Sequence, residues 1–472
     1  MIGTLAFRHL WVRKVRSRFL LLGFALGVGV MVVLLSVGEA MLDQSRDVSL
    51  VGGGEVTVLP QGIDIEAMRT GGLSGMFFTI ERARFLTRQV LGGPRHAGAV
   101  RTVAPAIEGK LLYLCPGRGS CSPVPVRAGG EIPSRAAALG AGLELRAGRW
   151  ADSRADSAYV RPTTQQLYDE LDRFHVPRRP DSTWGEWQYF NFVTAPDEWW
   201  YVTYLIGGEL PTGKWGGRML ITHRRPDGKY DRYTAEAPPQ RVTLDTTRAD
   251  LTIGESFVRQ RDGVYELRAR ARGDAGSILL DLAVRPAPNR YFPPVELRED
   301  ALLSGYVVPV LSASAEGKIC LGTRCSRVEK IAAYHDHNWG VWRDVTWEWG
   351  AAQGRRFNLL YGGVYGPAAT TSPFFLALVD SLGVRQVLRF SRIDYKPGGV
   401  AVPTRFTLVA TRDVDTLRLD IDVRHTLATE MSAAAFRRTF LQMRGAFRLA
   451  GKLSGQTITD AGEGFFETYL SR

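Results

Sequence analysis

The stretch Tyr334-His335-Asp336-His337-Asn338-Trp339-Gly340 decides how this chain is interpreted. It places a carboxyl group, two imidazoles, a phenol, an amide and an indole in one short run, and Trp347-Glu348-Trp349-Gly350 follows soon after it. Burying so many polar groups is costly unless they bond one another or a ligand. The stretch therefore predicts either a satisfied polar network in a protein core or a ligand site.

Side chains on a β-strand alternate between two faces, which here gives the sets Tyr334/Asp336/Asn338 and His335/His337/Trp339. If the first set points into a barrel, burial in an apolar cavity raises the pKa of Asp336. A protonated Asp336 can then donate a proton to an alkene, and aromatic faces stabilise the resulting cation. The alternative is an ionised Asp336 held as a structural corner by Tyr334 or by backbone donors.

His335 and His337 also form an HxH pair that suits a metal ion. A third ligand is needed; His425 or Glu348 could serve, but nothing in the sequence places either of them nearby. No GxSxG, HExxH or Cys/His nucleophile arrangement stands out, and no GxxxxGK[ST] loop is present. We therefore expect no metal and no cofactor.

Length and charge limit the remaining classes of function. At 472 residues the chain exceeds the size of one core, so about three domains are expected. The formal charge of +12 is concentrated at the start, where five basic residues precede the first acidic one: Arg8, Arg13, Lys14, Arg16 and Arg18. No basic stripe interleaved with aromatic residues follows, so no nucleic-acid partner is expected.

The four cysteines form two local pairs, Cys115/Cys121 and Cys320/Cys325. Each pair flanks a short loop that contains Gly and Arg, without the tight spacing or further ligands of a metal site. Two disulfides that close hairpins are the favoured interpretation. They indicate an oxidising compartment.

Residues 19–41 carry no charge before Glu39 and are long enough to cross a bilayer as a helix. The basic residues on the N-terminal side predict a cytoplasmic N-terminus, with residues 1–18 as an interfacial helix. A cleaved signal peptide is the alternative. We expect a single-pass protein of the cytoplasmic (inner) membrane, with the bulk of the chain in the periplasm.

The part of the chain expected to be exported divides into regions of different sequence pattern. Residues 45–160 mix short β-like runs, such as 110–114, with a helix over 133–139, and residues 161–184 read as a linker with one helical turn. From 185 on, aromatic and β-branched runs recur every 8 to 14 residues between Gly-containing turns. This predicts a mainly β protein with two antiparallel barrels, over 185–300 and 301–472, joined around 287–300.

The N-terminal region resembles permeases of the MacB/FtsX class. The resemblance rests on Arg8-His-Leu-Trp-Val-Arg-Lys-Val-Arg-Ser17, on Ser36-Val-Gly-Glu-Ala40 and on Leu145-Arg-Ala-Gly-Arg-Trp150. It implies a periplasmic core-like domain over 45–160 and ABC transporter permease and ATPase subunits as partners. The further membrane helices of that class do not follow, so transport by this chain alone is not expected.

The C-terminal region, about 185–472, resembles the carotenoid 1,2-hydratase (hydroxyneurosporene synthase) superfamily, which includes AttH-like lipocalin proteins. The resemblance rests on Asp197-Glu-Trp-Trp-Tyr-Val-Thr-Tyr-Leu205, on the 334–340 stretch and on Gly462-Glu-Gly-Phe-Phe-Glu-Thr-Tyr469. It implies two lipocalin-like barrels around an apolar ligand site, with Tyr334 and Asp336 as active-site residues in any enzyme. The His and Trp of the preceding strand in the hydratases are absent from Gly305-Tyr-Val-Val-Pro309.

The sequence thus leads to two hypotheses. The first is a membrane-anchored, periplasm-facing, AttH-like protein that binds an apolar lipid or isoprenoid beside an ABC-type export complex. The second is a hydro-lyase of the carotenoid 1,2-hydratase type, with Asp336 protonating an isoprenoid alkene. The expected ligand site is lined by Trp199, Tyr201, Tyr334, Asp336, Asn338 and Trp347.

Overall fold

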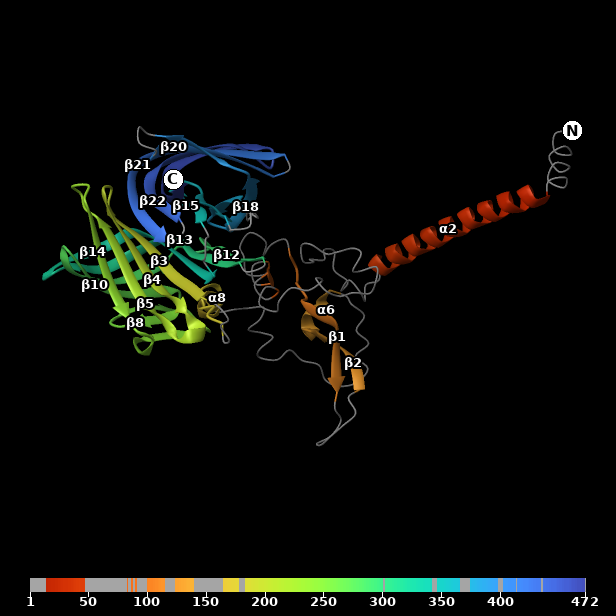
Figure 1. Cartoon of the computed structure of the whole chain (residues 1–472), viewed down its shortest axis with the longest axis horizontal. Helices are drawn as coiled ribbons and strands as arrows, with labels where there is room; N and C mark the ends of the chain where they lie inside the picture. The colour runs from red at the N-terminus through yellow and green to blue at the C-terminus, as the bar shows by residue number, and fades with distance from the viewer. Residues whose placement is uncertain are drawn as a thin grey trace. The chain divides into compact units, whose positions relative to one another are not determined.

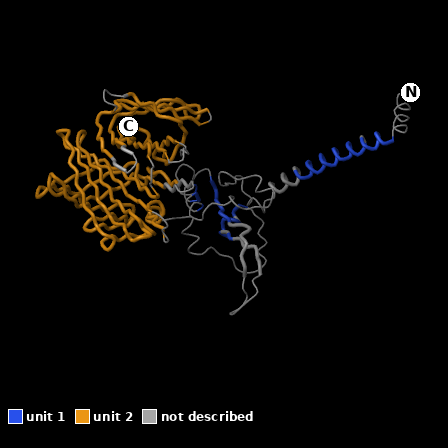
Figure 2. The backbone as a smooth tube through the Cα atoms, in the orientation of Figure 1, with its two compact units in different colours: residues 1–91, 99–161 blue, residues 92–98, 162–472 orange. Residues whose placement is uncertain are grey.

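The computed structural model describes residues 14–46, 83, 86–87, 90, 100–114, 124–139, 164–177, 183–299, 302–341, 346–365, 374–397, 402–412, 414–433 and 436–471. The chain forms two compact units, one of residues 1–91 with 99–161 and one of residues 92–98 with 162–472 (Figure 2). Most of the core-like domain expected over 45–160, including Cys115 and Cys121, lies outside the described residues.

The first unit begins with helix α2, Lys14–Arg46, drawn as one long helix in Figure 1. Its segment Lys14–Val37 contains an 18-residue window with a mean hydropathy of 2.7 and is long and apolar enough to cross a membrane. The apolar segment expected over 19–41 therefore falls on a helix. A signal sequence near the N-terminus can pass the same test of length and composition.

The first unit also contains a hairpin of strands β1, Ala106–Leu114, and β2, Val124–Glu131, followed by helix α6, Pro133–Ala138. These elements agree with the strand predicted over 110–114 and the helix predicted over 133–139.

In the second unit, eight antiparallel strands close a first barrel (Figure 1). In sheet order they are β11 (Gly276–Pro286), β13 (Leu302–Leu321), β14 (Arg324–Val341), β3 (Thr183–Ala195), β4 (Glu198–Glu209), β5 (Lys214–Arg224), β6 (Tyr230–Ala237) and β10 (Val264–Gly273). Pairing of β10 with β11 closes the ring. Outside the ring lie β7 (Val242–Asp245), β8 (Asp250–Ile253), β9 (Ser256–Arg261), β12 (Phe292–Glu299) and the short 3-10 helices η1 (Leu210–Thr212) and η2 (Pro239–Arg241).

Eight further strands close the second barrel. In sheet order they are β18 (Gly383–Phe390), β17 (Phe374–Asp380), β16 (Asn358–Tyr365), β15 (Thr346–Gly354), β23 (Gln456–Ser471), β22 (Phe436–Leu453), β21 (Asp415–Ala433) and β20 (Pro403–Arg412), with β19 (Ile393–Pro397) paired to β20. Its interior is filled by buried apolar side chains, among them Leu376, Leu388, Phe406 and Leu441. The mainly β fold with two lipocalin-like barrels is confirmed.

The boundary between the barrels differs from the predicted one. Strands β13 and β14 pair with β11 and β3, so they complete the first barrel and the change of sheet comes after Val341. The 334–340 stretch therefore lies on the first barrel, and the division predicted after residue 300 is corrected. Segment 287–300, expected to join the barrels, contains β12, which pairs with β13.

The segment expected to be a linker is also part of the first barrel. Helix α8, Thr164–Leu171, is the expected helical turn, and the residues after it enter the barrel, where Asp172 and Phe174 are almost completely buried. A polar segment can lie there because strand residues bond its polar groups.

Burial along the strands shows where the two barrels meet. In β10 the buried Tyr265, Leu267 and Ala269 alternate with exposed charged residues, as in a strand with one face in a core. In β14 this alternation stops, and all residues from Ala333 to His337 are buried. One face of β14 lines the first barrel and the other is covered by the second barrel.

The far end of β14 is closed by a disulfide. Cys320 of β13 and Cys325 of β14 face each other across the hairpin and are bonded, with a Cα–Cα distance of 3.9 Å. The predicted Cys320–Cys325 disulfide is confirmed.

Candidate functional site

An aromatic core fills the interface between the barrels. The first barrel contributes Tyr189, Tyr201 and Tyr334, and the second contributes Trp349 and Phe465. The Tyr334 ring lies edge-on to Phe465 at 4.7 Å between centroids, and the Trp349 indole N–H donates to the Tyr334 hydroxyl at 3.1 Å. Aromatic pairs of this kind add to the stability given by their buried area. This interface is where the structure brings the predicted site residues together.

Asp336 lies in this interface and is only 2% exposed. The amide of Asn338 donates to Asp336 Oδ1 at 2.6 Å, and the Tyr334 hydroxyl also bonds the carboxyl group. Burial and the charge of nearby Glu467 raise the pKa of Asp336 to about 8, against the weaker lowering effect of these hydrogen bonds. A carboxyl group that holds its proton near neutral pH is a general-acid candidate.

Glu467 is a second buried acid in the interface, and the sequence interpretation missed it. It comes from β23 of the second barrel, where the Trp347 indole and the Gln442 amide each donate to it at 3.1 Å. Burial raises the pKa of Glu467. Its position inside the aromatic run Phe465-Phe466-Glu467-Thr468-Tyr469 was the available signal, because a carboxyl group there is unusual without a partner.

From the sequence we considered an Asp336 that points into a barrel. In the structure, the face that carries Asp336 does not point into a barrel. The opposite face does, and it places His335 and His337 inside the first barrel, both fully buried. The alternation of side chains along 334–339 agrees with the prediction, but the Tyr334/Asp336/Asn338 face lies against the second barrel and not in a barrel interior. The interior beside these histidines contains polar groups and is not an apolar cavity.

Asp172 organises the polar groups inside the first barrel. His335 Nε2 lies 3.0 Å and His337 Nδ1 2.7 Å from its two oxygens, and the Tyr265 hydroxyl donates to it at 2.8 Å. Burial alone would raise the pKa of Asp172, but the two histidines hold it below its ordinary value. This network satisfies the polar groups that the segment after α8 brings into the barrel.

Glu186 of β3 binds the other side of His337. Its Oε1 lies 3.0 Å from His337 Nε2, and its Oε2 accepts from the Trp184 indole at 3.0 Å. Burial alone would lower the pKa of His337, but its bonds to Asp172 and Glu186 raise it to about 9. An imidazolium between two carboxylates is the stable form of this arrangement.

Three groups of the metal-ligating type meet in the same barrel. The ligand atoms of His175, Glu186 and His337 all lie within 4.8 Å of one another, so they could hold a metal ion. His337 and Glu186 are already hydrogen-bonded to each other and to further partners, so we interpret the cluster as a charge network. The expected third ligands are elsewhere: Glu348 is bonded to Thr468 at 2.8 Å, and His425 packs on Trp199.

A groove of about 560 Å³ runs along the interface between the barrels. Its volume is within the range of small-molecule sites. Much of its wall consists of apolar or small residues: Val193, Leu311, Ala332, Ala333, Tyr334, Ala351, Gly354, Ala446, Ala461, Gly462, Gly464 and Phe465. The remaining lining residues are polar or charged: Asn191, Gln353, Arg355, Arg424, Arg444 and Glu463.

Of the six residues expected to line the ligand site, Tyr334 alone lines this groove. Because Tyr334 also bonds Asp336, it connects the groove with the buried acid. Asn338 and Trp347 lie beside Asp336 and Glu467, where they bond the two acids. Tyr201 packs within the aromatic core, with its ring centroid 5.9 Å from that of Tyr189.

Trp199 is held between two arginines and a histidine. The guanidinium groups of Arg224 and Arg444 lie 4.6 and 5.2 Å from its ring centroid, and the His425 ring lies at 5.1 Å. These cation–π contacts position Arg444, which lines the groove. Trp199 therefore supports the groove from behind its wall.

The stretch 305–309, which lacks the His and Trp of the hydratases, packs against aromatic side chains in this structure. A side chain at Gly305 would collide with the Trp339 indole, because an added Cβ would lie 2.1 Å from that ring. Tyr306 packs edge-on against Trp349 at 5.1 Å between centroids. Aromatic packing between the barrels thus occupies this part of β13.

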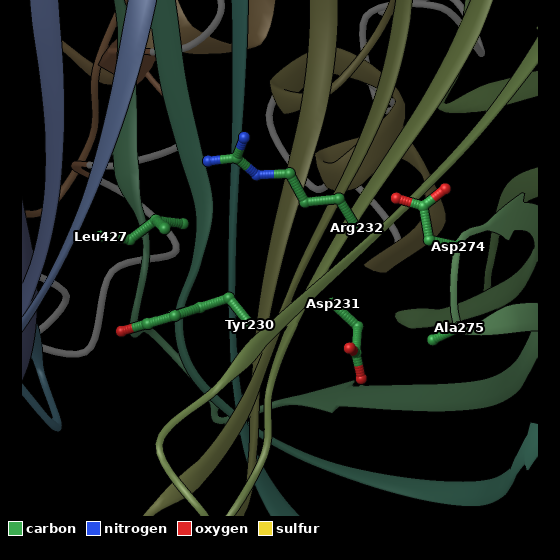
Figure 3. A pocket seen from close by; sticks show the side chains of 6 residues that line it. All are labelled: Tyr230, Asp231, Arg232, Asp274, Ala275 and Leu427. Atoms are coloured by element: carbon green, nitrogen blue, oxygen red, sulfur yellow. The ribbon is translucent and has the colours of Figure 1, made fainter.

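A smaller pocket of about 250 Å³ opens where β6 of the first barrel approaches β21 of the second. It is lined by Tyr230, Asp231, Arg232, Asp274, Ala275 and Leu427 (Figure 3). Arg232 donates to Thr429 of β21 at 2.9 Å. The pocket is lined by residues of both charges, and one of them makes this hydrogen bond between the barrels. We therefore interpret it as part of the packing contact between the two barrels.

No protein-family model matches this chain, and no curated protein matches it. Among solved structures it is similar to an AttH-like protein from Nitrosomonas europaea, at 14% identity over 63% of this chain and 96% of that chain, with a TM-score of 0.43. CghA with Sch210972 has 12% identity over 64% and 95%, with a TM-score of 0.43. Kievitone hydratase from Nectria haematococca has 14% identity over 66% and 94%, with a TM-score of 0.42.

The lipocalin-like fold implied by the resemblance is established by the two barrels themselves. The resemblance of residues 1–160 to permeases finds no support in these comparisons.

Proposed function

We propose that the paired barrels bind an apolar or amphipathic small molecule, such as a lipid or isoprenoid, in the groove between them. The observation that carries this proposal is the groove itself, about 560 Å³ in volume and walled largely by apolar and small side chains from both barrels. A pocket of this size and lining is the usual form of a small-molecule site.

We further propose that the chain is anchored by α2 in the cytoplasmic membrane, with the barrels in the periplasm beside an ABC-type export complex. The helix is long and apolar enough to span, and basic residues precede its apolar part. The Cys320–Cys325 disulfide supports an oxidising compartment.

A second candidate function is proton transfer to an alkene, as in a hydro-lyase. The specific observation is that Tyr334 lines the groove and is hydrogen-bonded to Asp336. A proton on Asp336 could reach a bound alkene through the phenol hydroxyl, which would donate its own proton and receive that of the acid. In this reaction Tyr334 would touch the substrate and Asp336 would resupply the proton. A water molecule would add to the resulting carbocation, and the proton that this water loses would return to the Asp336 carboxylate through Tyr334.

One experiment separates the two functions. The full-length protein and its Asp336→Asn variant are incubated with a membrane lipid extract, repurified in detergent, and their bound molecules identified by mass spectrometry. Equal retention of an unmodified ligand by both proteins supports binding. A hydrated or isomerised product formed by the wild type and lost in the variant supports the enzyme, and retention of nothing by either protein contradicts both.

A further inference from the structure

The polar groups of the groove indicate which kind of ligand it accepts. Asn191 of β3 is only 3% exposed and lines the groove, yet neither its amide nitrogen nor its amide oxygen has a hydrogen-bond partner among the described residues. Leaving a buried amide unbonded is costly. Both amide groups of Asn191 are thus available to a ligand in the groove that offers a donor or an acceptor.

The groove that Asn191 lines is positively charged. Three arginines line the groove, Arg355, Arg424 and Arg444, against the single glutamate Glu463, which leaves a formal charge of +2. Glu463 is paired with Arg424. Arg444 is half-buried and is positioned over the Trp199 ring, so its guanidinium is held at the groove wall.

We propose that the groove recognises an amphiphile with an anionic end, a carboxylate or a phosphate ester. The anion is bound by Arg444 and Asn191, and the apolar remainder lies along Val193, Leu311 and Phe465. Guanidinium and amide N–H groups are the donors that bind such oxyanions, and charge-assisted bonds to arginine are the stronger kind. This inference rests on the proposed function, because it assigns the ligand class of the same groove.

Binding of three ten-carbon probes tests the inference: decanoate, decyl phosphate and 1-decanol. The full-length protein is held in phosphatidylcholine nanodiscs, and titration calorimetry is corrected with empty nanodiscs. We expect at least one of the two anions to bind about tenfold more tightly than the alcohol, as one charge-assisted contact implies. The ranking of the two anions distinguishes a free carboxylate from a phosphate headgroup as the source.

Variants of the groove give the matched comparison. Arg444→Gln and Asn191→Leu should each weaken binding of the preferred anion about tenfold and leave 1-decanol unchanged, whereas Arg444→Lys should retain much of the affinity. Arg405→Gln is the control, because Arg405 is paired with Asp422 on β21 and does not line the groove.

The outcomes separate this inference from the function on which it rests. Equal binding of anion and alcohol, with no effect of Arg444→Gln, overturns the anionic end and leaves the apolar groove standing. Failure of all three probes to bind the wild type contradicts the proposed function as well.

Discussion

At the scale of single residues, Asp336 is the group whose surroundings are most unusual for its type. Burial beside Glu467 raises its pKa to about 8, so the folded protein holds a proton that the unfolded chain releases above about pH 4. Stability linked to this group therefore falls as the pH rises from about 4 to about 8, and the full penalty is present above pH 8.

Asp336→Asn should remove this pH dependence. The neutral amide has nearly the same shape and carries no charge to desolvate. We expect the unfolding free energy of the wild type to fall by up to about 4 kcal/mol because of this group between pH 5 and pH 8.5. The fall in the unfolding free energy of the variant should be smaller by the same amount. Urea unfolding at the two pH values measures the difference, with exposed Asp227→Asn as control. Parallel pH profiles in wild type and Asp336→Asn would contradict an acid with a raised pKa.

Sequence reasoning at this scale found one partner of the acid pair and missed the other. The spacing of Tyr334, Asp336 and Asn338 placed them on one face, because alternation is a local property of a strand. What covers that face depends on β23, more than 120 residues later, so Glu467 could not be assigned to it. The same holds for Asn191 and Arg444, which meet at the groove from different barrels.

At the scale of elements, the chain after α8 closes the interior of the first barrel. Asp172 bonds His335, His337 and Tyr265 there, and it is fully buried. Its lowered pKa means that its contribution to stability is present above about pH 4 and is lost as the pH falls. Sequence reasoning found the helical turn but read the segment as a linker, because its polar composition gives no sign of a buried partner.

Replacing Asp172 by alanine should destabilise the fold severely. The change removes the buried carboxylate that His335 and His337 share, and breaking a buried charged pair typically costs about 3–5 kcal/mol. Chemical unfolding at pH 7 measures the effect. Asp169→Ala on the half-buried face of α8 is the control and should cost much less. Comparable losses from the two variants would show that Asp172 does not hold the network.

The strands themselves were largely predictable. Runs such as 187–193, 199–206 and 278–284 fall within β3, β4 and β11, because aromatic and β-branched residues alternate there between turn signals. The grouping of strands into barrels was not, since pairing of β13 and β14 with the first sheet joins segments far apart in sequence. This is why the predicted boundary at residue 300 was misplaced.

At the scale of the whole molecule, the proposal assigns anchoring and partner contact to residues 1–161 and ligand binding to the barrels. Replacing residues 1–161 with an unrelated single-pass anchor should therefore preserve ligand retention and abolish copurification with permease and ATPase subunits. Affinity purification from the native membrane, followed by protein and lipid mass spectrometry, measures both. Equal copurification by the two proteins would remove any role of the N-terminal region in an export complex.

The central claim is that the groove between the barrels holds a small molecule, and filling the groove tests it most directly. Ala332 is exposed on β14 and lines the groove, whereas Ala450 is exposed on β22 outside it. Mass spectrometry of molecules copurifying with the full-length protein should show about one ligand per chain in wild type and Ala450→Trp, and a loss of most of it in Ala332→Trp. Unchanged retention in Ala332→Trp would contradict the claim.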